Sequence, residues 1–209
     1  TDDLNAFLKY LHARSHFAHG KLDNYTLVRQ IAQEAIELDD QYSVPYVLIA
    51  YTHYYDAKQG SSDSREKSFE MAEVFVRKAE TLDDSYPDTH VLMGFLFLYK
   101  KQFDEALNAG RKAIALGPNN AEAHMIMAHI LRFIGEFEEA FTMVNRALRL
   151  EPSYPSFYLT ELAMCQYYTG RYQEAVESAK DFMTMAEERG DSELLYFGHT
   201  SLAMNYVRL

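Results

Sequence analysis

Polar and apolar positions along the chain follow the period of amphipathic helices, and small residues recur within that pattern at fixed intervals. Ala128, Ala140, Ala147 and Pro152 follow one another at steps of 12, 7 and 5 residues, and the same steps start again at Gly94. A small residue on each of two helices lets their axes approach closely where they cross. The spacing therefore predicts pairs of antiparallel helices, each pair closed by a proline that cannot continue the second helix.

Between the first two small residues of a unit lies a short turn followed by an aromatic residue. Gly135 and Gly170 occupy this turn in two units and supply the positive-φ residue that ends a helix. Phe103, Phe137 and Tyr172 follow at equivalent places. We expect these aromatic side chains to lock the second helix of each pair onto the first.

The junctions between units also repeat. Leu116–Asn120 and Leu150–Tyr154 lie 34 residues apart, and related segments begin at Leu82 and Leu38. Each helix pair has an apolar face that it cannot bury alone, so the pairs must stack. In the second unit, Asp56–Arg65 is a polar insertion that we interpret as an exposed loop. The predicted units cover about 3–42, 43–86, 87–120, 121–155 and 156–195, followed by a terminal helix at 196–209.

This pattern resembles the tetratricopeptide repeat (TPR) over nearly the whole chain, most closely in residues 87–189. The resemblance implies an all-α, right-handed superhelical solenoid of antiparallel helix pairs with about 11 helices, built as a single array over residues 1–209. In such arrays the first helices of the pairs line a concave face. The function that the resemblance implies is that of a protein–protein interaction scaffold.

Helical periodicity selects the side chains that point toward this face, and they are apolar and rich in tyrosine and methionine. Tyrosine offers a large contact area at little entropic cost, and methionine adapts to varied shapes. One interpretation is a groove for an apolar peptide, a partner helix or another copy of the chain. The other is that these side chains pack within the stack. The predicted groove residues are Tyr51, Tyr54, Tyr55, Phe95, Leu98, Tyr99, His129, Arg132, Phe133, Met164, Tyr167 and Tyr168.

The charge of the chain limits the classes of molecule that it is expected to bind. The net charge is −11, and the basic residues form no stripe, which argues against nucleic acid and anionic membrane surfaces. Only Arg14 and Arg132 bring cations to the predicted face, so it is not suited to clamping an acidic peptide tail. The longest apolar run, Val91–Tyr99, is too short to span a membrane.

Candidate catalytic chemistry is sparse. His12, His16 and His19 are spaced along one helical face near Asp23, which leaves a histidine-based metal site as a less favoured alternative. The single cysteine, Cys165, is expected to be a small buried side chain. No phosphate-binding loop or nucleophile motif is present in the sequence. We therefore expect a protein that is not an enzyme, with no cofactor and no metal. His90, His124 and His199 recur at equivalent places, which indicates a packing role.

A second, narrower resemblance concerns the parent protein. Leu4–Arg14, the Leu-Asp-Asp-x-Tyr closures and Tyr154–Tyr158 look like the TPR tails of bacterial class III adenylate/guanylate cyclases and of winged-helix transcriptional regulators. This resemblance implies a cytoplasmic regulatory region in a bacterial protein. The chain starts without methionine and ends within a helical pattern, so we expect it to be part of a longer protein.

The terminal helix at 196–209 has no partner helix in the predicted array. Leu202, Tyr206 and Leu209 are its apolar residues that need a cover. We expect either a homodimer through this helix or its masking by further residues of the parent protein.

Overall fold

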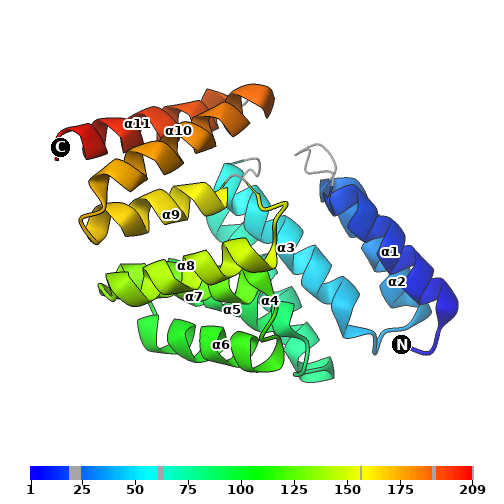
Figure 1. The fold of residues 1–209 in the computed structure, drawn as a ribbon. Helices are drawn as coiled ribbons and strands as arrows, with labels where there is room; N and C mark the ends of the chain where they lie inside the picture. The colour runs from blue at the N-terminus through cyan, green and yellow to red at the C-terminus, as the bar shows by residue number, and fades with distance from the viewer. Residues whose placement is uncertain (19–24, 61–63, 156, 190–191, 209) are drawn as a thin grey trace. The chain divides into compact units, whose positions relative to one another are not determined.

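The computed structural model describes residues 1–18, 25–60, 64–155, 157–189 and 192–208, and the secondary structure in these ranges is entirely helical (Figure 1). The prediction of an all-α protein with about 11 helices is confirmed, since the described residues form α1 to α11. The chain divides into two compact units, Thr1–Lys101 and Gln102–Leu209. The boundary between the units lies in the turn inside the predicted third pair.

The first unit contains two helix pairs and one further helix, and α1 packs on α2 as α3 packs on α4. Its core includes Ala32, Ala35 and Ala79, which have no exposed surface. The small side chains let the helices approach closely, as the spacing predicts. The helices are α1 (Leu4–Ala18), α2 (Tyr25–Leu38), α3 (Ser43–Gln59), α4 (Arg65–Leu82) and α5 (Pro87–Tyr99).

In the second unit, each helix packs on its neighbours in chain order, with α7 on α8 and α9 on α10 forming the predicted pairs. Ala128, Ala140 and Ala147 are fully buried at these contacts. The helices are α6 (Phe103–Leu116), α7 (Ala121–Ile134), α8 (Phe137–Leu150), α9 (Phe157–Tyr168), α10 (Tyr172–Arg189) and α11 (Ser192–Tyr206).

A recurrent hydrogen bond ties the start of each of three first helices to the turn before it. The Nε2 atoms of His90 and His124 lie 2.9 Å from the carbonyl oxygens six residues earlier. Tyr46, at the equivalent place in α3, donates its hydroxyl to the carbonyl of Asp40 at 3.1 Å. The predicted packing role of His90 and His124 is thereby confirmed, whereas His199 is exposed.

The predicted loop at Asp56–Arg65 is wrong in its first part. Helix α3 continues to Gln59, and the side chain of Asp56 is buried where it accepts a 2.6 Å hydrogen bond from Arg29. The extra residues of this unit therefore mainly lengthen α3 and α4, which have 17 and 18 residues. None of the helices in the described ranges is long and apolar enough to cross a membrane.

The turn before each of four second helices holds a residue with positive φ. Three of these residues are glycines, namely Gly60 (φ 67°) and the predicted Gly135 (φ 93°) and Gly170 (φ 78°), but the fourth is Lys101 (φ 59°). A side chain in this left-handed conformation costs roughly 1–2 kcal/mol because Cβ approaches the following carbonyl oxygen. Lys101 is therefore a strained position.

Lys101→Gly is expected to raise the free energy of unfolding by about 1 kcal/mol, because glycine removes this steric cost. Gly135→Ala should lower it by about the same amount, since a Cβ at Gly135 meets nothing within 4 Å and the cost is that of the backbone alone. Urea denaturation of both variants measures the effects. A destabilised Lys101→Gly variant would contradict the assignment of strain.

Candidate functional site

A buried carboxylate joins α7 to α9 in the second unit. Glu161, which is 3% exposed, accepts two hydrogen bonds from Arg132, at 2.7 Å from Nε and 3.1 Å from Nη2. His129 Nε2 lies 3.2 Å from the same carboxylate. The thiol of Cys165 is 3.8 Å from Oε1. This cluster pairs the buried charge and satisfies it with hydrogen bonds, which a buried carboxylate requires.

The cluster also determines which groups are ionised. Burial acts to raise the pKa of Glu161, but the charges of His129 and Arg132 outweigh it, and the pKa lies below its ordinary value. Burial raises the pKa of the Cys165 thiol to about 12, with Glu161 adding to the effect. Cys165 is buried and free of disulfide bonds, so its expected role as a small interior side chain is confirmed. The carboxylate therefore stays charged and the thiol stays protonated at neutral pH.

Two aromatic rings remain exposed beside this cluster. The guanidinium of Arg132 lies over the ring of Phe133, 4.7 Å from its centroid, and Phe133 is 55% exposed. Tyr168, on α9, is 43% exposed and stacks on Phe137 with 4.6 Å between ring centroids. Burial acts to lower the pKa of Arg132, but the hydrogen bonds to Glu161 and its charge outweigh burial and hold the pKa above its ordinary value.

The other predicted residues of this unit lie on α9. Met164 and Tyr167 are half-buried, and the hydroxyl of Tyr167 accepts a 3.2 Å hydrogen bond from Arg208. We use the name α7–α9 face for the predicted groove residues of the second unit, which are His129, Arg132, Phe133, Met164, Tyr167 and Tyr168.

In the first unit most of the predicted groove residues are packed against other aromatic rings. Tyr54 is 6% exposed and its ring lies 5.4 Å from Phe95 and 6.0 Å from Phe69. Tyr51, Tyr55, Phe95 and Leu98 are half-buried. Tyr99 stacks on Phe69 at 3.7 Å but keeps 43% of its surface exposed. Of the six residues, Tyr99 has the largest exposed fraction.

The sequence interpretation misses both buried carboxylates. In the first unit Asp56 pairs with Arg29 across α2 and α3, although the polar run around it predicts a loop. In the second unit the repeat pattern assigns Glu161 no role. Its signal in the sequence is a carboxylate inside the mainly apolar segment Tyr158–Cys165, because a charge on a buried helix face needs an ionic partner.

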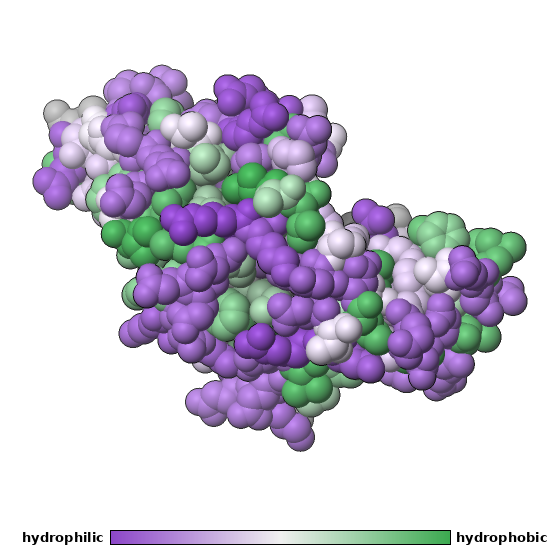
Figure 2. Space-filling model, turned by 90° about the horizontal axis from the view of Figure 1, so that it is seen from below, coloured by the Kyte–Doolittle hydropathy of each residue, from purple (hydrophilic) through white to green (hydrophobic). Residues whose placement is uncertain are grey.

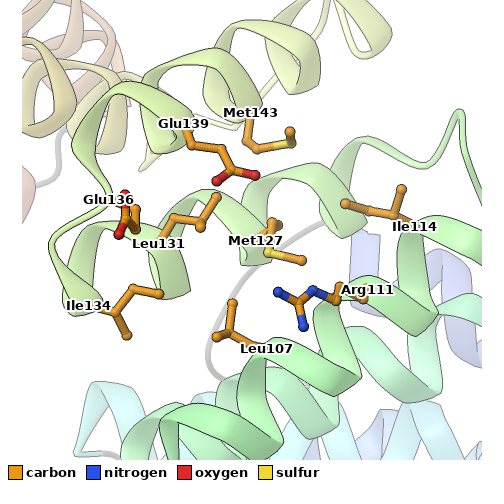
Figure 3. Close-up of a pocket in the computed structure, with 9 residues that line it drawn as sticks. All are labelled: Leu107, Arg111, Ile114, Met127, Leu131, Ile134, Glu136, Glu139 and Met143. Carbon is orange, nitrogen blue, oxygen red and sulfur yellow. The ribbon is translucent and has the colours of Figure 1, made fainter.

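A separate cleft of about 470 Å³ lies between α6, α7 and α8, on the side of α7 that carries Met127, Leu131 and Ile134 (Figure 3). None of the predicted groove residues lines it. Its polar lining consists of Arg111, Glu136 and Glu139. The two glutamates stand at the start of α8, where carboxylates are favoured by the helix dipole.

The histidine arrangements offer few metal ligands. His12 and His16 lie on the exposed side of α1 with 3.1 Å between their Nε2 atoms, while His19 and Asp23 lie outside the described residues. Elsewhere Glu80, Asp84 and His90 place one ligand atom each within 4.8 Å of one another. The Nε2 atom of His90 is already engaged with the Asp84 carbonyl.

Comparison with known proteins identifies the fold. The profile of the family described as "Anaphase-promoting complex, cyclosome, subunit 3" matches residues 99–182. The chain is similar to a thermophilic TPR protein, TTC0263 of Thermus thermophilus, with 18% identity and a TM-score of 0.71 over 95% of this chain and 99% of that one. It is also similar to PilW, a type IV pilus biogenesis factor, with 17% identity and a TM-score of 0.66 over 98% of this chain and 94% of that one.

These similarities show that the protein has a helical-repeat fold. More specifically, its fold is that of tetratricopeptide-repeat proteins, as the repeat spacing predicts. No curated protein matches the chain in sequence. The matches give no support to the narrower resemblance to the tails of nucleotide cyclases or winged-helix regulators.

Glu161→Gln is expected to lower the free energy of unfolding at pH 7 by about 3 kcal/mol, because it leaves the buried Arg132 without its counter-charge. The pKa of Glu161 is depressed in the folded state, so its contribution is present above the unfolded value of 4.5 and is lost as the pH falls through the folded value. Chemical denaturation between pH 7 and pH 3 should show the two proteins converging below pH 4.5.

Glu139→Gln is the matched control for this measurement. Glu139 is exposed and forms no side-chain hydrogen bond or ion pair within the described residues, so its effect should stay within about 0.5 kcal/mol. Equal losses in the two variants would contradict the assigned role of Glu161.

Proposed function

We propose that the protein is an interaction scaffold that binds a peptide or partner helix on the tyrosine- and methionine-rich face of its first helices. The observation that carries the proposal is the pair of exposed rings, Phe133 and Tyr168, held on neighbouring helices beside a buried ion cluster. The TPR fold supports a protein-binding role, because stacked repeats form extended binding surfaces.

The α7–α9 face is suited to binding because its side chains are already positioned. The bidentate contact to Glu161 holds Arg132 in place, and Arg132 in turn covers one side of the Phe133 ring. The ring of Phe137 stacks on the ring of Tyr168 and supports it from one side. Rings ordered before binding lose little entropy on association, and exposed aromatic and arginine side chains often dominate binding energy. Met164 adds an adaptable side chain to the same face.

The proposal assigns this chain no catalytic residue and no cofactor, and it makes the region a regulatory part of a larger cytoplasmic protein. The net charge of −11 disfavours nucleic acid and anionic membrane as partners. Binding of metal through the histidines of α1 is the less favoured alternative. Stoichiometric zinc or nickel in the purified protein, with loss of stability on chelation, would support that alternative.

Peptides selected from a random phage-displayed library on the wild-type protein provide a probe for the α7–α9 face. Phe133→Ala and Tyr168→Ala should each weaken their binding at least tenfold in fluorescence polarisation, because each removes an exposed aromatic contact. Leu116→Ala is the control, since Leu116 is also exposed, at 37%, but belongs to α6. Selected peptides that bind all three variants as tightly as wild type would overturn the proposal.

Self-association through α11 is the second part of the proposal. Of the three residues predicted to need a cover, Tyr206 is 54% exposed, Leu202 is half-buried and Leu209 lies outside the described residues. Met204 and Val207 are also exposed at this end of the chain, with Val207 at 85%. Val207→Glu should lower the average mass measured by light scattering at high concentration, because the charge opposes burial of this end. An unchanged average mass would contradict an interface at α11.

A further inference from the structure

Helix α1 carries a continuous apolar stripe on its outer side. Its buried side chains, Ala6, Tyr10 and Ala13, belong to the core of the first unit. The outer side chains follow the spacing i, i+3, i+4 and i+7, which aligns them along one face. They are Leu4 (67% exposed), Phe7 (42%), Leu8 (52%) and Leu11 (40%).

Such a stripe differs from the scattered apolar residues of an ordinary surface. Single exposed leucines are normal, whereas a contiguous apolar patch marks a site of contact with another protein. Figure 2 shows hydrophobic surface at the right of the view, the side on which α1 lies in Figure 1. The helical spacing of the stripe is that of a helix–helix interface.

The charges around the stripe indicate the kind of helix that covers it. Asp2 and Asp3 precede the stripe, and α1 has no acidic residue of its own. The charged or titratable side chains of α1 other than Tyr10 are all basic: His12, Arg14, His16 and Lys9, of which Lys9 is ion-paired with Glu34 of α2. The helix is therefore acidic at its beginning and basic toward its end. A second helix with the same polarity complements it only when the two run antiparallel.

We propose that α1 pairs with α1 of a second copy of this chain in an antiparallel, two-fold symmetric contact. In that arrangement Leu4 of each copy faces Leu11 of the other, and Phe7 faces Leu8. Asp3 of each copy then lies beside the C-terminal part of the other copy's α1, where Arg14 is located. A two-fold contact needs a surface that is complementary to itself, and the stripe with its opposite charges at the two ends meets that need. Antiparallel helix dipoles add to the attraction.

The α1 contact involves neither the α7–α9 face nor α11. Its test can therefore fail without affecting the proposals for those two surfaces. Val207→Glu serves as the background chain, so that association through α11 does not contribute. In this background, sedimentation should show a reversible dimer. Leu8→Glu should raise its dissociation constant at least tenfold, because it places a charge at the centre of the interface. Val74→Glu, at a residue of α4 that is 60% exposed, should leave it unchanged.

The direction of the two helices is tested by cross-linking. Thr1→Cys and Ser15→Cys chains are mixed and treated with a short bismaleimide, while the native Cys165 stays unreactive because it is buried. An antiparallel pair brings position 1 of one copy beside position 15 of the other, and separates identical positions by about 20 Å along the axis. Cross-links between unlike chains should therefore predominate.

Three results would overturn the proposal. The first is a monomeric Val207→Glu chain at concentrations near 1 mM. The second is equal weakening of the dimer by Leu8→Glu and Val74→Glu. The third is cross-linking between identical positions in preference to unlike ones, which would indicate parallel helices. Correctly folded variants are identified by unchanged helical circular dichroism and a cooperative unfolding transition.

Discussion

The close approach of paired helices at small side chains is the constraint on which the rest of the structure depends. Paired helices bury alanine at their crossing, as at Ala128 and Ala140, so the two axes lie near one another. No pair buries its apolar surface alone, and each must pack on the next. The first helices consequently keep one side that faces away from their partner helix.

Charge plays two different roles in this framework. Most of the acidic excess lies on exposed helix surfaces, but Glu161 and Asp56 are taken into the packing between helices and paired with arginine. A buried pair contributes little net stability, because desolvation offsets the attraction between the charges, and breaking it is costly. The main consequence of the Glu161–Arg132 pair is that it fixes the positions of side chains. By holding Arg132 against α9, the cluster keeps the Arg132 guanidinium over the ring of Phe133.

Aromatic residues that helical periodicity assigns to the same predicted groove also differ in how far they are buried. Tyr54 and Tyr99 both lie on first helices of the first unit, yet Tyr54 is enclosed by Phe69 and Phe95 while Tyr99 keeps much of its surface exposed. The period of a helix identifies the side on which a residue lies. It does not reveal whether a neighbouring ring covers that residue, because covering depends on side chains far away in sequence. The packing interpretation therefore holds for Tyr54, whereas the binding groove stays a prediction for the exposed residues.

The sequence by itself determined the repeat, the helical fold class, the helix pairs inside each unit and the structural role of His90 and His124, because these depend on spacing within about forty residues. Tertiary structure alone decided that Asp56 is a buried helical residue, that Glu161 joins α7 to α9, and that Lys101 adopts a conformation usually left to glycine. It also decided which side of α1 remains uncovered. The physical reason is that burial and ion pairing are properties of surfaces brought together by packing, whereas helical periodicity is a property of one segment.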